Sequence, residues 1–214
     1  LAFEELFFFA IGLKLLRSRR ETVSVEPFQP VDMAPFYNAL PFTLTDAQRR
    51  CVEEAIADMQ SGKPMNRLCQ GDVGSGKTMV AAACVYFCVK NGRQAALMAP
   101  TELLAEQHYR GLAPLLERLN IRCALLTGST PAKTKRSVTA QLATGEIDFA
   151  IGTHALISGG VAYADLGLVV TDEQHRFGVA QRTALAEKGE HPHTLVMSAT
   201  PIPRTLALIL YGDL

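Results

Sequence analysis

The segment GDVGSGKT at residues 71–78 constrains the fold more than any other part of this sequence. It matches the pattern GxxxxGK[ST] at every fixed position, follows a short apolar run and opens a helical stretch from Thr78 to about Lys90. Glycines allow such a loop to curl so that its backbone N–H groups point at phosphate oxygens, and the helix N-terminus adds a favourable dipole. The alternative is a chance glycine-rich turn, which the strand before the loop and the helix after it disfavour. The residues of the predicted phosphate site are Gly71, Asp72, Val73, Gly74, Ser75, Gly76, Lys77 and Thr78.

Two positions of the chain carry the predicted chemistry of hydrolysis. In the loop, Lys77 would hold the β and γ phosphates of a nucleotide, and Thr78 would offer its hydroxyl to Mg²⁺. A second site follows the apolar run 168–171, where Asp172 and Glu173 stand side by side. Because ligands of α/β sheets bind beyond the C-terminal ends of the strands, Asp172 would hold Mg²⁺ through its water shell and Glu173 would deprotonate the attacking water. The alternative is a solvated acidic strand end, which the phosphate loop in the same domain disfavours.

Short apolar runs alternate with helical stretches from residue 42 onwards. The runs predicted as strands are 67–70, 95–99, 122–126, 148–152, 168–171 and 194–197. The stretches predicted as helices are 45–59, 102–119 and 131–144, besides the one that follows the phosphate loop. Strands that are buried on both faces and separated by helices indicate an α/β domain with a doubly wound parallel sheet.

Composition excludes two classes of protein. With 48% hydrophobic residues and 21 Lys and Arg against 21 Asp and Glu, the 214-residue chain is neither disordered nor a nucleic-acid binder that depends on bulk positive charge. The five cysteines include no CxxC pair and predict buried thiols in a reducing compartment, not a zinc or redox site. His191 and His193 are predicted to lie in a surface turn.

The first 41 residues differ from the rest of the chain. Residues 1–20 are predicted to form an amphipathic helical arm, because acidic residues lead the stretch and Lys14 interrupts it too early for a membrane span. Residues 21–41 contain four prolines and are predicted as an extended linker, which leaves 42–214 as the α/β domain. No membrane partner is expected. Because the sequence starts at Leu1 and ends at Leu214, we expect it to be a piece of a longer protein.

The segment from Thr45 to Gln48 allows two interpretations. Structurally it is a capping box, in which Thr45 caps a helix and Gln48 reaches back from the third helical position. Functionally, the amide of Gln48 can read the edge of an adenine with two hydrogen bonds. From residue types alone the cap is favoured, because S/T-x-x-Q is common where helices begin.

Further motifs extend the pattern along nearly the whole chain. They are 42–45 with Gln48, 71–78, 99–108, 127–129, 152–156, 172–179 and 198–205, together with FEEL at 3–6. This series resembles the motor of superfamily 2 helicases, and among them the RecG family of ATP-dependent helicases that remodel branched DNA. Transcription-repair coupling translocases and replication-restart helicases are the nearest alternatives. The DEQH form, the GSGKT loop and the FEEL segment favour the RecG family.

The resemblance implies a RecA-like lobe that uses ATP and Mg²⁺, with residue roles beyond the phosphate site. Gln48 would select adenine, which reverses the preference drawn from residue types alone. His175 would face Ser198 and Thr200 and couple the nucleotide state to DNA binding. The residues implied to line the DNA path are Pro100, Thr101, Glu102, Thr127, Gly128, Thr153 and His154. Ordinary strand-to-helix loops are the alternative for each of these positions.

The resemblance also implies what the complete protein does. It would drive fork reversal and Holliday junction branch migration in recombination and repair, with branched or forked duplex DNA, a second RecA-like lobe and a wedge domain as partners, in the bacterial cytoplasm. A single lobe without the second lobe's arginine finger is expected to hydrolyse ATP slowly, since such a finger contributes ~10³–10⁵ in rate. Two other classes stay open: a nucleotide switch that does not hydrolyse, which Glu173 argues against, and a P-loop kinase, for which no acceptor pocket is evident.

Overall fold

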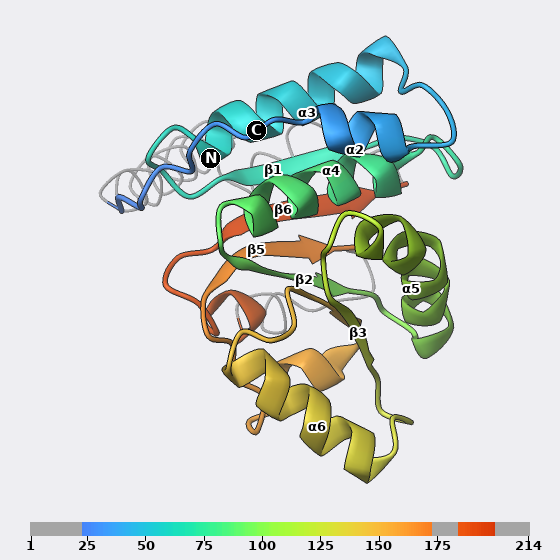
Figure 1. The fold of residues 1–214 in the computed structure, drawn as a ribbon, viewed down its shortest axis with the longest axis vertical. Helices are drawn as coiled ribbons and strands as arrows, with labels where there is room; N and C mark the ends of the chain where they lie inside the picture. The colour runs from blue at the N-terminus through green and yellow to red at the C-terminus, as the bar shows by residue number, and fades with distance from the viewer. Residues whose placement is uncertain (1–22, 173–183, 200–214) are drawn as a thin grey trace, which may run out of the picture.

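A computed structural model describes residues 23–172 and 184–199, and within these ranges six strands form one parallel sheet. The strands are β1 (Asn66–Gln70), β2 (Gln94–Met98), β3 (Cys123–Leu126), β4 (Phe149–Gly152), β5 (Leu166–Thr171) and β6 (His193–Ser198). Their order across the sheet is β1-β6-β5-β2-β4-β3, and every neighbouring pair is parallel (Figure 1). Each predicted strand is present with ends within two residues, so the predicted α/β fold with a parallel sheet is confirmed.

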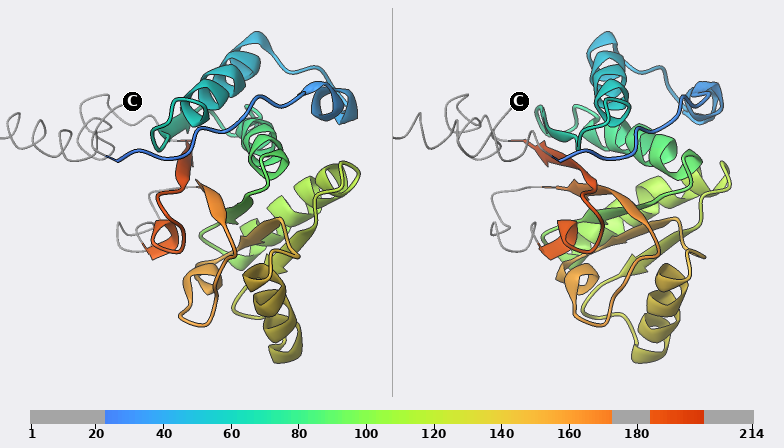
Figure 2. Two further views of the ribbon diagram at one scale, coloured as in Figure 1. Left: turned by 60° about the vertical axis from the view of Figure 1, so that its left-hand side comes forward. Right: turned by 90° about the vertical axis from the view of Figure 1, so that its left-hand side faces the viewer.

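Helices cover both faces of this sheet. They are α2 (Ala34–Ala39), α3 (Asp46–Met59), α4 (Lys77–Lys90), α5 (Glu102–Glu117) and α6 (Ala132–Ala143), with a 3₁₀ turn η1 (His154–Ile157). The helices α3, α4 and α5 share one hydrophobic core with the sheet, and α6 and η1 belong to a second. In Figures 1 and 2, α3 and α6 accordingly lie at opposite ends of the molecule.

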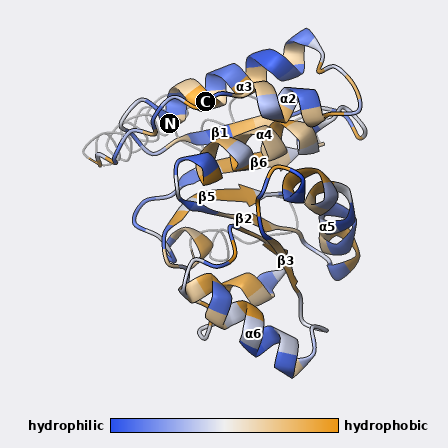
Figure 3. Cartoon of the chain, viewed as in Figure 1, coloured by the Kyte–Doolittle hydropathy of each residue, from blue (hydrophilic) through white to orange (hydrophobic). Residues whose placement is uncertain are grey.

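Alternation along β5 shows how one strand serves both cores. Leu168 and Val170 lie in the core of α3, α4 and α5, whereas Val169 lies in the core of α6. Because successive side chains point to opposite faces, Asp172 belongs to the same face as Val170. The strands β2, β4 and β5 are buried along their whole length. Figure 3 shows β5 as mostly hydrophobic.

The segment between residues 23 and 41 is more than a linker. The prediction of an extended chain is wrong for 34–39, which form α2 with Pro35 in its first turn, where a proline costs no helical hydrogen bond. Phe28 and Phe36 are buried in the core of α3, α4 and α5, and the ring of Phe36 lies 5.6 Å from that of Tyr86 on α4. The hydrophobic effect thus attaches this segment to the lobe. The arm predicted for residues 1–20 lies outside the described residues, and the predicted domain boundaries stay predictions.

The predicted buried thiols are confirmed for Cys69, Cys84 and Cys88, whereas Cys51 and Cys123 are half-buried. All five cysteines are free. Burial raises the pKa of Cys69 to about 11 and that of Cys84 to about 12. Both groups are therefore unreactive thiols at neutral pH.

The surface turn predicted for the two histidines near β6 is wrong for His193. This residue begins β6 and is buried, and its Nδ1 accepts a hydrogen bond from the N–H of Met65 at 2.9 Å. Its ring packs nearly perpendicular to that of Phe28, with the ring centres 4.7 Å apart. His191 remains exposed in the preceding turn. The imidazole thus joins the 23–41 segment to the sheet.

We expect this histidine to make the chain sensitive to acid. Burial, with a smaller contribution from the positive charge of Arg93, lowers the pKa of His193 from 6.5 to about 4. The contribution of the neutral His193 to the free energy of unfolding is therefore complete above pH 6.5. As the pH falls from 6.5 towards 4, the free energy of unfolding decreases by on the order of 3 kcal/mol. Urea unfolding at a series of pH values measures it. A His193→Gln variant should lose less stability than the parent chain over this range, and an equal loss in both would contradict the prediction.

Candidate nucleotide and DNA site

The loop of residues 71–78 joins β1 to α4 in the conformation that the glycines permit. Gly74 and Gly76 have φ of 80° and 81°, a region that only glycine enters at little cost. The N–H of Gly71 donates to the carbonyl of Ser198 at 3.1 Å, which fixes the start of the loop to the end of β6. Within the described residues no side chain caps α4, so its N-terminus is left for a ligand. The loop therefore has the shape and polarity of a phosphate site.

The ammonium of Lys77 lies over the loop that it belongs to. Nζ donates to the carbonyl oxygens of Gly71 and Asp72, the second at 2.8 Å, and lies 3.4 Å from Oγ of Ser75. Three acceptors of one loop thus hold a positive charge beside the N-terminus of α4. A cation and backbone N–H groups together favour an anionic ligand.

Gln48 makes the capping box and also reaches the phosphate loop. Its Oε1 accepts from the N–H of Thr45 at 2.9 Å, and the hydroxyl of Thr45 accepts from the N–H of Gln48, so the predicted capping box is confirmed. Its Nε2 donates to the carbonyl of Ser75 at 2.8 Å. Both ends of the amide are therefore engaged, and reading an adenine would require Gln48 to exchange at least one of these hydrogen bonds. The adenine contact stays a prediction.

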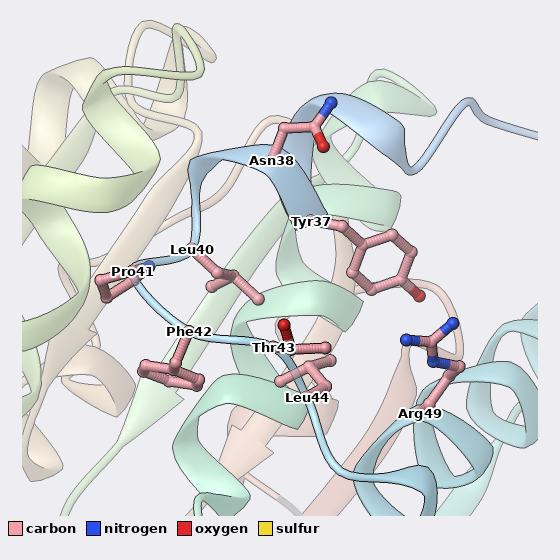
Figure 4. Close-up of a pocket in the computed structure, with 8 residues that line it drawn as sticks. All are labelled: Tyr37, Asn38, Leu40, Pro41, Phe42, Thr43, Leu44 and Arg49. Atoms are coloured by element: carbon pink, nitrogen blue, oxygen red, sulfur yellow. The ribbon is translucent and has the colours of Figure 1, made fainter.

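A pocket of about 440 Å³ opens where α2 leads into α3. Its lining residues are Tyr37, Asn38, Leu40, Pro41, Phe42, Thr43, Leu44 and Arg49. Figure 4 shows Tyr37 and Arg49 on one side and Phe42 on the other. Phe42 is 50% exposed, which is unusual for so large an apolar ring. Sequence reasoning did not identify this pocket, although exposed aromatic and basic groups suit a planar heterocycle.

Asp172 follows β5 at the C-terminal edge of the sheet, as predicted. Its N–H donates to the carbonyl of Met98 at 3.0 Å, and its side chain is only 14% exposed. Oδ2 lies 2.6 Å from Nε2 of His108 on α5, a contact that sequence reasoning missed because 64 residues separate the two. Glu173, His175 and Thr200 lie outside the described residues.

Three strand ends bring the predicted nucleotide residues to one edge of the sheet. Ser198 ends β6 and is buried, and its carbonyl accepts the hydrogen bond from the N–H of Gly71. Because β6 lies between β1 and β5, the phosphate loop and Asp172 flank it on either side. Thr78 and Asp172 offer a hydroxyl and a carboxylate, hard oxygen ligands that fit Mg²⁺, which takes its other ligands from phosphate and water. No group of three or more His, Cys, Asp or Glu that would make an all-protein metal cage occurs in residues 23–172 and 184–199.

The predicted DNA-path residues also meet at this edge, because they follow β2, β3 and β4. Thr101 caps α5, its hydroxyl accepting from the N–H of Leu104 at 3.3 Å. Oε1 of Glu102 accepts from the N–H of Ser129 at 3.0 Å, and hydrogen bonding to Ser129 lowers the pKa of Glu102. The start of α5 is thereby tied to the loop after β3.

The remaining DNA-path residues differ in how far they are accessible. Thr127 and Thr153 are 3% and 2% exposed, so their side chains face inward, and the hydroxyl of Thr127 lies 3.0 Å from that of Ser129. His154 is exposed at the start of η1. Backbone groups and exposed residues of these loops are thus the available contacts for a phosphate chain. The DNA contacts stay predictions.

Comparison with known proteins agrees with the fold. The sequence profile of the DEAD/DEAH box helicases matches residues 45–209. The chain belongs to the DEAD/DEAH box helicase family. It is 51% identical over 215 residues to the ATP-dependent DNA helicase RecG of Streptococcus pneumoniae and 50% identical over 216 residues to that of Thermotoga maritima. These matches cover 99% and 100% of the chain but 32% and 28% of the relatives, so the chain spans about a third or less of their length.

Solved structures of helicases are also similar to this one. A RecG bound to a three-way DNA junction has a TM-score of 0.86 at 47% identity, over 98% of this chain and 28% of that one. A DEAD-box helicase bound to single-stranded RNA shares the fold, with a TM-score of 0.66 at 18% identity. The predicted RecA-like fold and the resemblance to RecG helicases are therefore confirmed. No helix within residues 23–172 and 184–199 is both long and apolar enough to cross a membrane.

Proposed function

We propose that this chain is the nucleotide-binding lobe of an ATP-dependent helicase that remodels branched DNA. The observation that carries the proposal is the meeting of two sites at one sheet edge: the phosphate loop with Asp172, and the loops after β2 and β3 joined by the contact from Glu102 to Ser129. Ligand binding at either site can move the other through the strands and α5. An ATP-driven motor needs such a connection.

For ATP, the described residues have roles that their positions support, and Glu173, His175 and Thr200 have the roles that the resemblance implies. Lys77 and the N–H groups of the loop hold the β and γ phosphates, and Gln48 with the pocket around Phe42 receives the adenine. Thr78 and Asp172 hold Mg²⁺, which neutralises phosphate charge when bound. Glu173 orients and deprotonates the attacking water. His175, Ser198 and Thr200 couple the nucleotide state to DNA.

For DNA, the loops after β2, β3 and β4 bind the sugar-phosphate backbone without reading sequence. The contacts come from backbone N–H groups, the half-buried Pro100 and Thr101 and the exposed His154, with Gly128 allowing close approach. The net charge of zero suits a lobe that contributes part of a DNA path and relies on the second lobe and a wedge domain of the same polypeptide for the rest. The RecG relatives support a branched or forked duplex as substrate and the bacterial cytoplasm as location.

ATP hydrolysis by the complete protein, measured on forked and on linear duplex DNA, tests this proposal. We expect forked DNA to raise the rate of hydrolysis more than linear duplex does, because binding of the preferred DNA would shift the protein towards the state that hydrolyses ATP. Equal stimulation by linear duplex would favour a transcription-coupled translocase. No stimulation by DNA, together with unchanged turnover in Glu173→Gln, would favour a nucleotide switch and refute the motor.

A further inference from the structure

His108 lies on α5, a helix of the predicted DNA path, yet its ring reaches the predicted metal ligand at the end of β5. Nε2 of His108 is 2.6 Å from Oδ2 of Asp172, and the two side chains are 11% and 14% exposed. An ionised carboxylate only accepts hydrogen bonds, so Nε2 donates. A short hydrogen bond shielded from water holds both groups in one orientation.

We propose that His108 is a positioning residue that orients the carboxylate of Asp172 for Mg²⁺ and links that carboxylate to the DNA-facing start of α5. The inference rests on the proposed nucleotide site. The backbone of Asp172 is already fixed by its N–H bond to Met98. The hydrogen bond from His108 restricts the rotation of the carboxylate about its side-chain bonds. Outer partners of metal ligands commonly act in this way.

The link to DNA follows from the rigidity of α5. The part of the helix from Glu102 to His108 precedes its internal Pro114, and His108 lies six residues, or about 9 Å, from Glu102. Glu102 accepts a hydrogen bond from Ser129, so the loops after β2 and β3 are both attached to the N-terminal end of α5. A DNA-induced displacement of that end would shift the ring of His108 and with it the carboxylate of Asp172. The pair thus provides a direct path between the two proposed sites.

Three substitutions separate the hydrogen bond from the shape of the side chain. In His108→Gln, the amide nitrogen stands as many bonds from the backbone as Nε2 does and can donate to Asp172. In His108→Asn the amide is too short to reach, and His108→Ala has no donor. Arg110→Ala is the matched control, since Arg110 is exposed on the same helix and pairs only with Glu106 among the ion pairs of the described residues.

The measurement is the affinity of the complete protein for a fluorescent ADP analogue, with EDTA and across a Mg²⁺ titration. We expect His108→Asn and His108→Ala to need about 10–100-fold more Mg²⁺, while His108→Gln and Arg110→Ala behave as the parent. Affinity in EDTA should stay unchanged in all four, which damage to the fold would not allow. At saturating Mg²⁺, His108→Ala should still show weaker stimulation of ATP hydrolysis by forked DNA.

Other outcomes overturn the inference in distinguishable ways. An unchanged Mg²⁺ requirement in His108→Asn and His108→Ala, with Lys77→Ala still abolishing binding, refutes the positioning role alone. Unchanged DNA stimulation in His108→Ala refutes the link through α5. Equal losses in EDTA for all three His108 variants indicate a packing role instead. Normal nucleotide binding by Lys77→Ala would refute the proposed nucleotide site and this inference with it.

Discussion

Replacing Lys77 with alanine is expected to lower ATP hydrolysis by the complete protein by about 10²–10³-fold, the usual cost of removing one preorganised group that stabilises transition-state charge. The structure places the Lys77 ammonium against carbonyls of its own loop, beside the N-terminus of α4. Lys90 and Lys188 differ from Lys77, because they donate to carbonyls elsewhere in the fold. Steady-state phosphate release with and without forked DNA measures the effect.

The matched control for this prediction is Lys63→Ala. Lys63 is exposed in the turn before β1, so the substitution removes the same charge at a distance from the loop. It should leave hydrolysis within about twofold of the parent, as expected for a surface residue away from the site. Equal losses in both variants, or activity retained by Lys77→Ala, would mean that the loop does not hold the phosphates.

Replacing Gly152 with alanine is expected to destabilise the lobe by about 3 kcal/mol or more, the upper range for overpacking a core. Gly152 ends β4, a central strand, where it pairs with Leu126 of β3 and Met98 of β2. An added Cβ would collide with the backbone carbonyl of Leu126 and lie 3.0 Å from Cγ of Leu156. Backbone on one side and a buried leucine on the other leave little room to adjust. Urea unfolding of the chain measures the change.

A second glycine of this chain gives the opposite expectation. Gly111 lies in α5 with no atom within 4 Å of an added Cβ. Gly111→Ala should therefore stabilise the lobe by about 0.5–1 kcal/mol, because alanine loses less backbone entropy in a helix. If Gly152→Ala proved as stable as Gly111→Ala, the close approach of β3 and β4 in this structure would be wrong.

The phosphate loop and the capping box were predictable because their determinants are local. Gly74 and Gly76 occupy the positive φ that only glycine adopts cheaply, and Thr45 and Gln48 satisfy helix N–H groups three residues apart. The six strands were predictable for a similar reason, since apolar runs buried on both faces have few other solutions. Such features depend on hydrogen bonds and dihedral angles within a few residues, which any window of the sequence contains.

The helix α2 shows where this reasoning failed. Four prolines between residues 21 and 41 suggested an extended linker, yet Pro35 sits in the first turn of a helix and Phe36 is fully buried. The prediction of a surface turn for His193 was also wrong, since its burial depends on contacts with Phe28 and with the N–H of Met65. Distant contacts decided both outcomes, and burial of apolar rings outweighed the local preference for turns.

The sequence by itself determined the class of fold, the phosphate loop and the positions at which strands end, because periodicity and glycine conformations are encoded locally. Only the tertiary structure decided which strand ends become neighbours. The order β1-β6-β5 places Ser198 and Asp172 beside the loop, and α5 brings His108 to within 2.6 Å of Asp172. Contacts of this kind join residues far apart in the sequence, such as Met65 and His193, which are 128 positions apart. These contacts form because the sheet buries both of its faces under helices from different parts of the chain. No short segment of the sequence contains enough information to predict that arrangement.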